Sequence, residues 1–173
     1  HRVPAEGDVV LADRLLPRLR AALPGPALGT LLRVIHTARP AEALDAAWAI
    51  VEGSDRERVE VAAAFLLERD GARAWPWLIS RSKLDPDLGK AVVKTMGFGF
   101  SRDRTVFAAL PVRTLAEIWE WAVSLWPYRE WQGVRSIVSG DELRDKVLVA
   151  IEQAASDPRT TDEALNRLHV LAV

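Results

Sequence analysis

Apolar residues recur every three or four positions along nearly the whole chain, as in SDRERVEVAAAFLLERDG, which begins at Ser54. This spacing places the apolar side chains on one face of an α-helix. No stretch has the sustained period-two alternation, flanked by hairpin turns, that is typical of a β-strand. The pattern therefore predicts an all-α fold.

Helix start and stop signals set the expected boundaries. Capping boxes, in which a hydroxyl residue precedes a glutamate by three positions, are predicted at Ser54 with Glu57, Thr114 with Glu117, and Thr160 with Glu163. Prolines that suit the first turn of a helix are Pro40 and Pro86, and glycines that suit a helix end are Gly53, Gly71 and Gly97. The expected helices span 8–23, 28–38, 40–52, 54–70, 72–82, 86–96, 103–110, 114–126, 141–155 and 161–172.

These helices are short and closely spaced. Connections of two to four residues make neighbouring helices antiparallel, and Pro17 is expected to kink or split the first one. Helix pairs of about 40 residues stacked side by side suit the length of 173 residues. We therefore expect one domain over 1–173, a HEAT-like α-solenoid of short antiparallel helix pairs. The alternative is an irregular multi-helix bundle.

The charge balance disfavours partners that are recognised by bulk electrostatics. Lysine and arginine number 23 against 24 aspartate and glutamate, which gives a formal net charge of −1. A near-neutral chain has no strong field toward nucleic acid or an acidic membrane. Cysteine is absent, no apolar run is long enough to span a bilayer, and nothing resembles a signal peptide. We expect a cytoplasmic protein without membrane contact. Because the chain begins with His1, we also expect it to be part of a longer protein.

The sequence contains no recognised motif for catalysis or cofactor binding. Motifs for phosphate loops, dinucleotide binding, zinc proteases and nucleophile elbows are absent. The fragment GFGFS, from Gly97, follows an expected helix, whereas a dinucleotide loop follows a strand. The histidines are His1, His36 and His169. None of them has a second histidine or a carboxylate three or four positions away, the spacing that places two metal ligands on one helical face. We expect no enzyme activity, no metal and no cofactor.

Four of the seven tryptophans lie between Thr114 and Trp131. A helix from Thr114 places Trp119 and Trp126 on its apolar stripe, so both are expected in the core. Trp121 projects beside that stripe and can either cover the next helix pair or stay partly exposed. Trp131 follows in a polar loop without a periodic partner. It either folds back over the helix ends or anchors a partner.

Aromatic residues and arginine dominate the energetics of protein interfaces. The candidate partner-binding residues are Trp121, Tyr128, Arg129, Trp131 and Arg135. They favour a non-catalytic protein-interaction module whose partner is another protein or the rest of its own parent chain. Arginines near the two longest expected loops, 97–102 and 127–140, leave a nucleic-acid-binding helical repeat as the alternative, but interspersed acidic residues disfavour it.

One segment also resembles a known family. It comprises ALPVRTLAEIWEWAVSLWPYRE, the helix DELRDKVLVAIE and the stretch TTDEALNRL. These are similar to the helical repeats that follow the ATPase module in bacterial NACHT-type STAND proteins, where a leucine, tryptophan and proline end a helix. Leu125, Trp126 and Pro127 match that helix end, while Tyr128 and Arg129 stand where acidic residues are usual. The resemblance covers about 60 residues and implies the sensor or autoinhibitory region of a defence or signalling protein.

Overall fold

The structure is a computed structural model. Every regular secondary-structure element among the described residues is a helix, and none is a strand. The structure describes residues 6–20, 25–100, 107, 109–125 and 138–156, and for 6, 20, 97–100 and 138–146 it describes the backbone alone. The predicted all-α class is thus confirmed.

The chain divides into two compact units, His1–Asp70 and Gly71–Val173, hereafter unit 1 and unit 2. The division falls where α4 ends and α5 begins. Asp70 closes α4 with its backbone N–H on the Leu66 carbonyl oxygen, and Gly71 is already the first residue of α5. The single domain expected over 1–173 stays a prediction.

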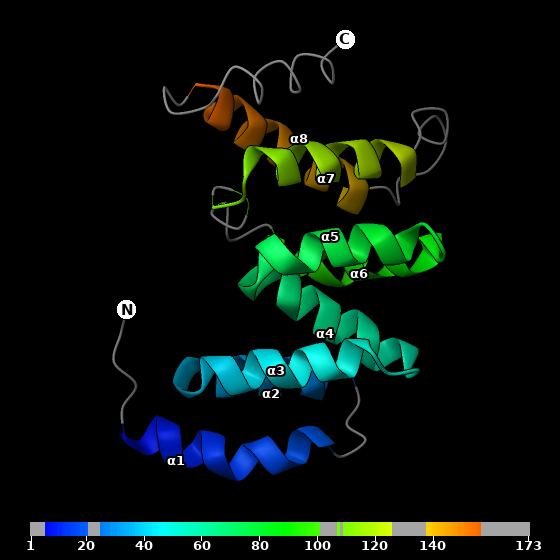
Figure 1. The fold of residues 1–173 in the computed structure, drawn as a ribbon. Coiled ribbons are helices and arrows are strands. Elements are labelled where there is room, and N and C mark those ends of the chain that lie inside the picture. Colours follow the sequence, from blue (N-terminus) through cyan, green and yellow to red (C-terminus); the bar gives the residue numbers. More distant parts are fainter. Residues whose placement is uncertain (1–5, 21–24, 101–106, 108, 126–137, 157–173) are drawn as a thin grey trace. The chain divides into compact units, whose positions relative to one another are not determined.

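Unit 1 is built around α2. Its elements are α1 (Glu6–Leu15), the 3₁₀ helix η1 (Leu16–Arg20), α2 (Gly25–Ala38), α3 (Pro40–Val51) and α4 (Arg56–Arg69). Helix α2 packs against α1, α3 and α4, and α3 also packs against α4 (Figure 1). The core comes from the apolar stripes of these helices, including Leu28, Leu32, Ile35, Phe65 and Leu66. Burial of such side chains is the main stabilising contribution to a small helical unit.

Pro17 splits the first helix of unit 1, as its position predicts. Helix α1 ends at Leu15, and residues Leu16–Arg20 continue as a 3₁₀ helix. A proline inside an α-helix lacks the N–H of the i to i−4 hydrogen bond, and its ring clashes with the preceding turn. The tighter 3₁₀ turn accommodates that break.

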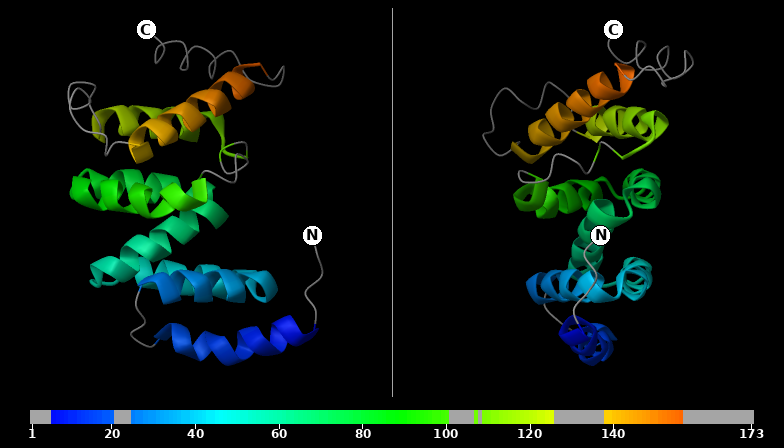
Figure 2. Two further views of the ribbon diagram at one scale, coloured as in Figure 1. Left: turned by 180° about the vertical axis from the view of Figure 1, so that it is seen from behind. Right: turned by 90° about the vertical axis from the view of Figure 1, so that its left-hand side faces the viewer.

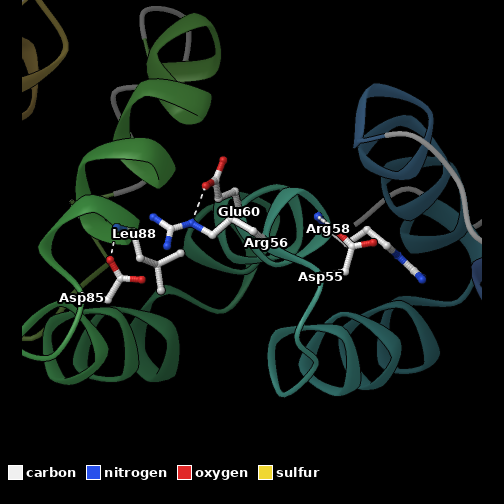
Figure 3. Close-up of polar contacts among 6 residues, drawn as sticks. All are labelled: Asp55, Arg56, Arg58, Glu60, Asp85 and Leu88. Carbon is white, nitrogen blue, oxygen red and sulfur yellow. Dashed lines mark hydrogen bonds and ion pairs between the residues drawn. The ribbon is translucent and has the colours of Figure 1, made fainter.

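The predicted capping box at Ser54 is wrong, because Asp55 is the residue that caps α4. The Asp55 side chain accepts a hydrogen bond from the Arg58 backbone N–H at 3.3 Å (Figure 3). The Glu57 carboxylate does not reach back to the cap. Its Oε1 instead accepts from the backbone N–H of Gly25, at 2.9 Å, where α2 begins. An aspartate directly before the first turn is as good a cap as serine, so the adjacent residue took the role.

Two ion pairs connect elements of unit 1. Arg39, between α2 and α3, holds Asp13 of α1 with two parallel contacts, Nε to Oδ1 at 3.1 Å and Nη2 to Oδ2 at 3.2 Å. Arg33 of α2 reaches Glu68 of α4 at 3.1 Å. Both pairs are solvent-exposed on at least one side, so water and salt screen them, and they contribute little to stability and mainly fix geometry.

Unit 2 consists of α5 (Gly71–Ser82), α6 (Pro86–Phe100), α7 (Val112–Leu125) and α8 (Val138–Ala155). Helix α5 packs against α6 and α7, while α8 packs against α6 and α7 (Figure 2). The expected antiparallel pairing holds for α5 and α6, whose short connection contains Asp85. The Asp85 Oδ1 accepts from the Leu88 backbone N–H at 3.1 Å, so Pro86 begins a capped helix (Figure 3).

Two predicted signals for helix boundaries in unit 2 are wrong, the stop at Gly97 and the capping box at Thr114. Helix α6 runs through Gly97 to Phe100 instead of ending at 96. Helix α7 begins at Val112, so Thr114 lies inside its first turn, buried, and does not cap it. Glu117 pairs with Arg113 at 3.0 Å instead of with the cap backbone. A threonine and a glutamate three positions apart occur inside helices as well as at their starts, so the pattern alone misplaced the boundary. The expected helix 161–172 and the capping box at Thr160 lie outside the described residues. Most of the expected helix 103–110 does so too.

None of the described helices combines the length and the apolar character needed to cross a membrane.

Candidate functional site

Of the five predicted partner-binding residues, the structure describes Trp121. Tyr128, Arg129, Trp131 and Arg135 lie outside the described residues, as does Trp126. The candidate site is therefore built from Trp121 and the helices around it, all within unit 2.

Trp121 lies on the inner side of α7 and is only 6% exposed. Its ring meets that of Trp75 on α5 edge-on, with centroids 5.9 Å apart and planes inclined at 67°. Trp75 in turn lies 5.8 Å from the ring of Phe107, at 34°. Edge-on aromatic pairs at this separation are favoured beyond the area they bury. Of the two roles left open for Trp121, the structure supports covering the neighbouring helices.

A glycine on α6 allows this packing. A Cβ added at Gly89 would lie 2.9 Å from Cζ2 of Trp121 and 2.6 Å from Oγ of Ser82. Real Cβ atoms do not approach so closely, and neither an indole ring nor a hydroxyl bound to the Leu78 carbonyl oxygen moves freely. Gly89 is thus the point where α6 approaches both α5 and α7.

The position of Trp119 differs from the apolar stripe that was predicted for α7. Trp119 was predicted to be in the core, but it is only half-buried, whereas Ile118, Trp121, Ala122 and Leu125 are buried. The reason is that α7 packs against both α5 and α8. Two neighbours bury a broader arc of the helix, and the centre of that arc is set by their positions and not by the apolar spacing alone.

Pro76 separates a buried tryptophan from a half-buried one. Trp75 is fully buried and Trp77 is half-buried, because the two residues project to different sides of α5. Pro76 lies inside α5. Pro76 is exposed, so the backbone position that lacks an N–H donor faces solvent.

A cleft lies between α5 and α7 and has the edge of Trp121 in its wall. It consists of two adjoining cavities, of about 450 Å³ and about 370 Å³, which share Lys83, Trp121 and Ser124. The first is also lined by Pro76, Ile79, Ser80, Glu117 and Glu120, and the second by Ser82, Pro86, Lys90 and Leu125. We call these two cavities together the Trp121 cleft.

The chemistry of the Trp121 cleft suits contact more than catalysis. Its ionisable groups are lysines and glutamates, and Glu117 is already paired with Arg113. The hydroxyls of Ser82 and Ser124 donate to the carbonyl oxygens of Leu78 and Trp121, at 2.7 Å and 2.8 Å. A serine nucleophile needs an adjacent base instead. In the described part of the chain, no group of three histidine, cysteine, aspartate or glutamate residues could hold a metal ion.

His36 in unit 1 is a packed histidine. It is half-buried near the end of α2 and meets the ring of Phe65 edge-on, with centroids 5.6 Å apart and planes inclined at 79°. Burial lowers the pKa of His36, and the positive charge of Arg69 lowers it further. Both effects favour the neutral imidazole.

Sequence reasoning missed a second hollow surface, which lies in unit 1 between α3 and η1. It has a volume of about 930 Å³, and α3 lines one side of it with residues between Glu42 and Gly53. The available signal was that α3 is apolar around more of its circumference than one core face requires: Ala43, Ala47 and Val51 are buried, yet Ala46, Ala49 and Ile50 are apolar too. A second apolar face on a helix indicates a second contact.

Comparison with known proteins adds no relative. No protein-family model matches the chain, and no curated protein or solved structure matches it either.

Proposed function

We propose that the chain is a non-catalytic helical-repeat module that binds another protein or a further part of its own parent chain. The observation that supports this most directly is the Trp121 cleft. It combines an aromatic edge, apolar residues such as Pro76 and Ile79, and charges of both signs at Lys83 and Glu120. A mainly packed aromatic residue with a polar rim is typical of protein interfaces.

A protein partner is favoured over nucleic acid by the state of the arginines. Four of them are paired with carboxylates in the described residues: Arg33 with Glu68, Arg39 with Asp13, Arg56 with Glu60 and Arg113 with Glu117. Phosphate binding requires cationic groups whose charge is not already neutralised by neighbours. These pairs reduce the positive surface that such a ligand would need.

The finer architecture and the biological role belong to the same proposal. Consecutive helices pack against each other within each unit, as the helices of HEAT-like repeats do, and we propose that the helix pairs stack as an α-solenoid. The resemblance of 109–168 to the repeats of NACHT-type STAND proteins leads us to propose a sensor or autoinhibitory region. Its partner would release a separate ATPase and effector.

The first test is to sequence the gene on both sides of this chain. A P-loop ATPase module upstream supports the sensor assignment and supplies a partner to measure. A reading frame that holds no such module overturns the STAND part of the proposal and leaves a free-standing interaction module.

Where the ATPase is present, its turnover is measured with and without the purified chain. Ser124→Arg fills the Trp121 cleft, and Ser156→Arg is the matched control. Both serines are exposed, near the end of a helix, and donate their hydroxyl to a backbone carbonyl in the preceding turn. Inhibition that Ser124→Arg relieves and Ser156→Arg retains supports the cleft as the contact. Equal inhibition by all three proteins excludes it.

Trp131 is tested in the same assay. Trp131→Ala is expected to weaken partner binding and leave thermal stability nearly unchanged, because interface anchors contribute to the complex and not to the fold. A large loss of stability without an effect on binding would instead identify Trp131 as a packing residue.

A further inference from the structure

The hollow surface in unit 1 is separate from the Trp121 cleft, since every residue that lines it lies between Leu16 and Arg58. Its lining comprises Leu16, Pro17, Leu19, Glu42, Asp45, Ala46, Ala49, Ile50, Gly53, Ser54, Asp55 and Arg58. We call it the α3 groove. Its volume of about 930 Å³ exceeds that of either cavity of the Trp121 cleft.

One side of the groove is a continuous face of α3. Glu42, Asp45, Ala46, Ala49 and Ile50 recur at intervals of three and four residues, so they share one face of the helix. The opposite face, with Ala43, Ala47 and Val51, is buried in the core of unit 1. The groove face thus has no partner in the core, and its small side chains allow a second helix to approach closely.

The other side of the groove is held in place by a hydrogen bond. Leu16, Pro17 and Leu19 form it on η1, and Nη2 of Arg58 on α4 donates to the Leu19 carbonyl oxygen at 2.9 Å. The residues that meet at this end of the groove therefore come from three elements. A groove wall tied to the next helix needs little ordering when a ligand binds, which favours affinity.

The charge of the groove is uneven. Three of its lining residues are acidic, Glu42, Asp45 and Asp55, and one, Arg58, is basic. The guanidinium of Arg58 is engaged by the Leu19 carbonyl, and Asp55 Oδ1 accepts from the Arg58 backbone N–H (Figure 3). Glu42 and Asp45 are exposed on the α3 side. A cationic ligand meets attraction along that rim, and an anionic one is repelled.

The shape and polarity favour a peptide segment over a small molecule. Small-molecule sites have polar groups that converge on the ligand from several directions. Here the exposed carboxylates of Glu42 and Asp45 lie along one rim, beside an apolar floor of Ala46, Ala49 and Ile50. An apolar strip with charge along one edge is the pattern on which amphipathic helices dock.

We propose that the α3 groove binds a basic amphipathic helix of another protein. Apolar side chains of that helix lie over Ala46, Ala49 and Ile50, and its lysine or arginine residues pair with Glu42 and Asp45. This is a second interaction surface, in a different unit from the Trp121 cleft, so it does not depend on the function proposed above.

The test uses the full chain and two fluorescent synthetic peptides of about 14 residues, roughly four helical turns. Both carry leucine at every third or fourth position, and the remaining positions are lysine in one peptide and glutamate in the other. Fluorescence anisotropy at low salt gives the two affinities. We expect the lysine peptide to bind at least about tenfold more tightly than the glutamate peptide, and less tightly as salt is added, because the contacts are exposed.

Variants then locate the binding. Glu42→Lys is expected to weaken the lysine peptide about tenfold, since it replaces an attraction by a repulsion. Glu152→Lys makes the same charge change on an exposed residue of α8 in unit 2, and it should alter the affinity less than about twofold. Ser124→Arg, in the Trp121 cleft, should alter it equally little. Circular dichroism confirms that each variant is folded.

Four outcomes overturn the proposal. The first three are no binding of the lysine peptide up to about 1 mM, equal binding of the two peptides, and equal losses with Glu42→Lys and Glu152→Lys. The last result would mean attraction to the overall charge and not to the groove. A loss with Ser124→Arg alone would assign the peptide to the Trp121 cleft, which supports the proposed function and excludes the α3 groove.

Discussion

Trp121 and Trp75 meet edge-on in the core of unit 2, with ring centroids 5.9 Å apart, and only 6% of Trp121 is exposed. The same residue thus has two contacts: most of its indole packs against α5, and its remaining edge lines the Trp121 cleft. A substitution at Trp121 changes both at once. Substitutions around it are needed to separate stability from binding.

Trp121→Ala is expected to lower the free energy of unfolding by about 3–5 kcal/mol, because it removes a large buried side chain and leaves a cavity beside Trp75. Ser124→Arg, at the exposed side of the same cleft, should change it by less than about 1 kcal/mol. Urea denaturation followed by circular dichroism measures both. A Trp121→Ala variant of unchanged stability would show that this indole is not part of the core.

Gly89→Ala is expected to destabilise unit 2 by about 1–3 kcal/mol, as overpacking of a close helix contact does. The added methyl group would lie 2.9 Å from Trp121 Cζ2 and 2.6 Å from Ser82 Oγ, so one of the three helices must shift. The thermal midpoint and the urea midpoint should both fall.

Gly7→Ala is the control for that substitution. Gly7 lies in α1, and a Cβ added there meets no atom within 4 Å. In an exposed helical position alanine is favoured over glycine, so stability should rise, by up to about 1 kcal/mol. If Gly89→Ala also raised stability, the close approach at Gly89 would be wrong.

Asp55→Ala is expected to cost about 1 kcal/mol, since it removes the side-chain acceptor for the backbone N–H of Arg58. Ser54→Ala, at the residue first expected to cap α4, should cost little. Equilibrium urea denaturation compares the two. The reverse order, with Ser54→Ala the more costly, would restore the predicted capping box.

The stability of unit 1 should decrease as pH falls below about 6.5, the ordinary pKa of histidine. Burial lowers the pKa of His36 in the folded state, so in this range the unfolded chain takes up a proton that the folded chain resists. The unfolded state therefore binds more protons, and stability rises with pH.

His36→Gln is expected to reduce that dependence. Free energies of unfolding at about pH 7.5 and about pH 5.5 give the comparison, above the range in which most carboxylates titrate. An unchanged slope in His36→Gln would assign the dependence to other groups.

The local patterns predicted most of the helices. Apolar residues at three- and four-residue spacing identified α2 to α8 within a few residues, and Pro17 and Pro86 marked a break and a start that the structure confirms. These features depend on interactions within one or two turns of the backbone, so the amino acids near each position determine them. Helix boundaries were less certain where either of two neighbouring residues could cap the helix, as with Ser54 and Asp55.

Which side chains are buried was decided by the packing of helices far apart in the sequence. Trp119 and Trp121 are two positions apart on the same helix and equally apolar, yet Trp121 is buried against α5 and α6 whereas Trp119 is half-buried. The α3 groove likewise exists because η1, held by Arg58, lies beside a face of α3 that the core leaves uncovered. Local periodicity by itself determined that this chain is helical, because hydrogen bonds within a helix span four residues. Only the tertiary contacts decided which faces of those helices form the core and which remain available for a partner.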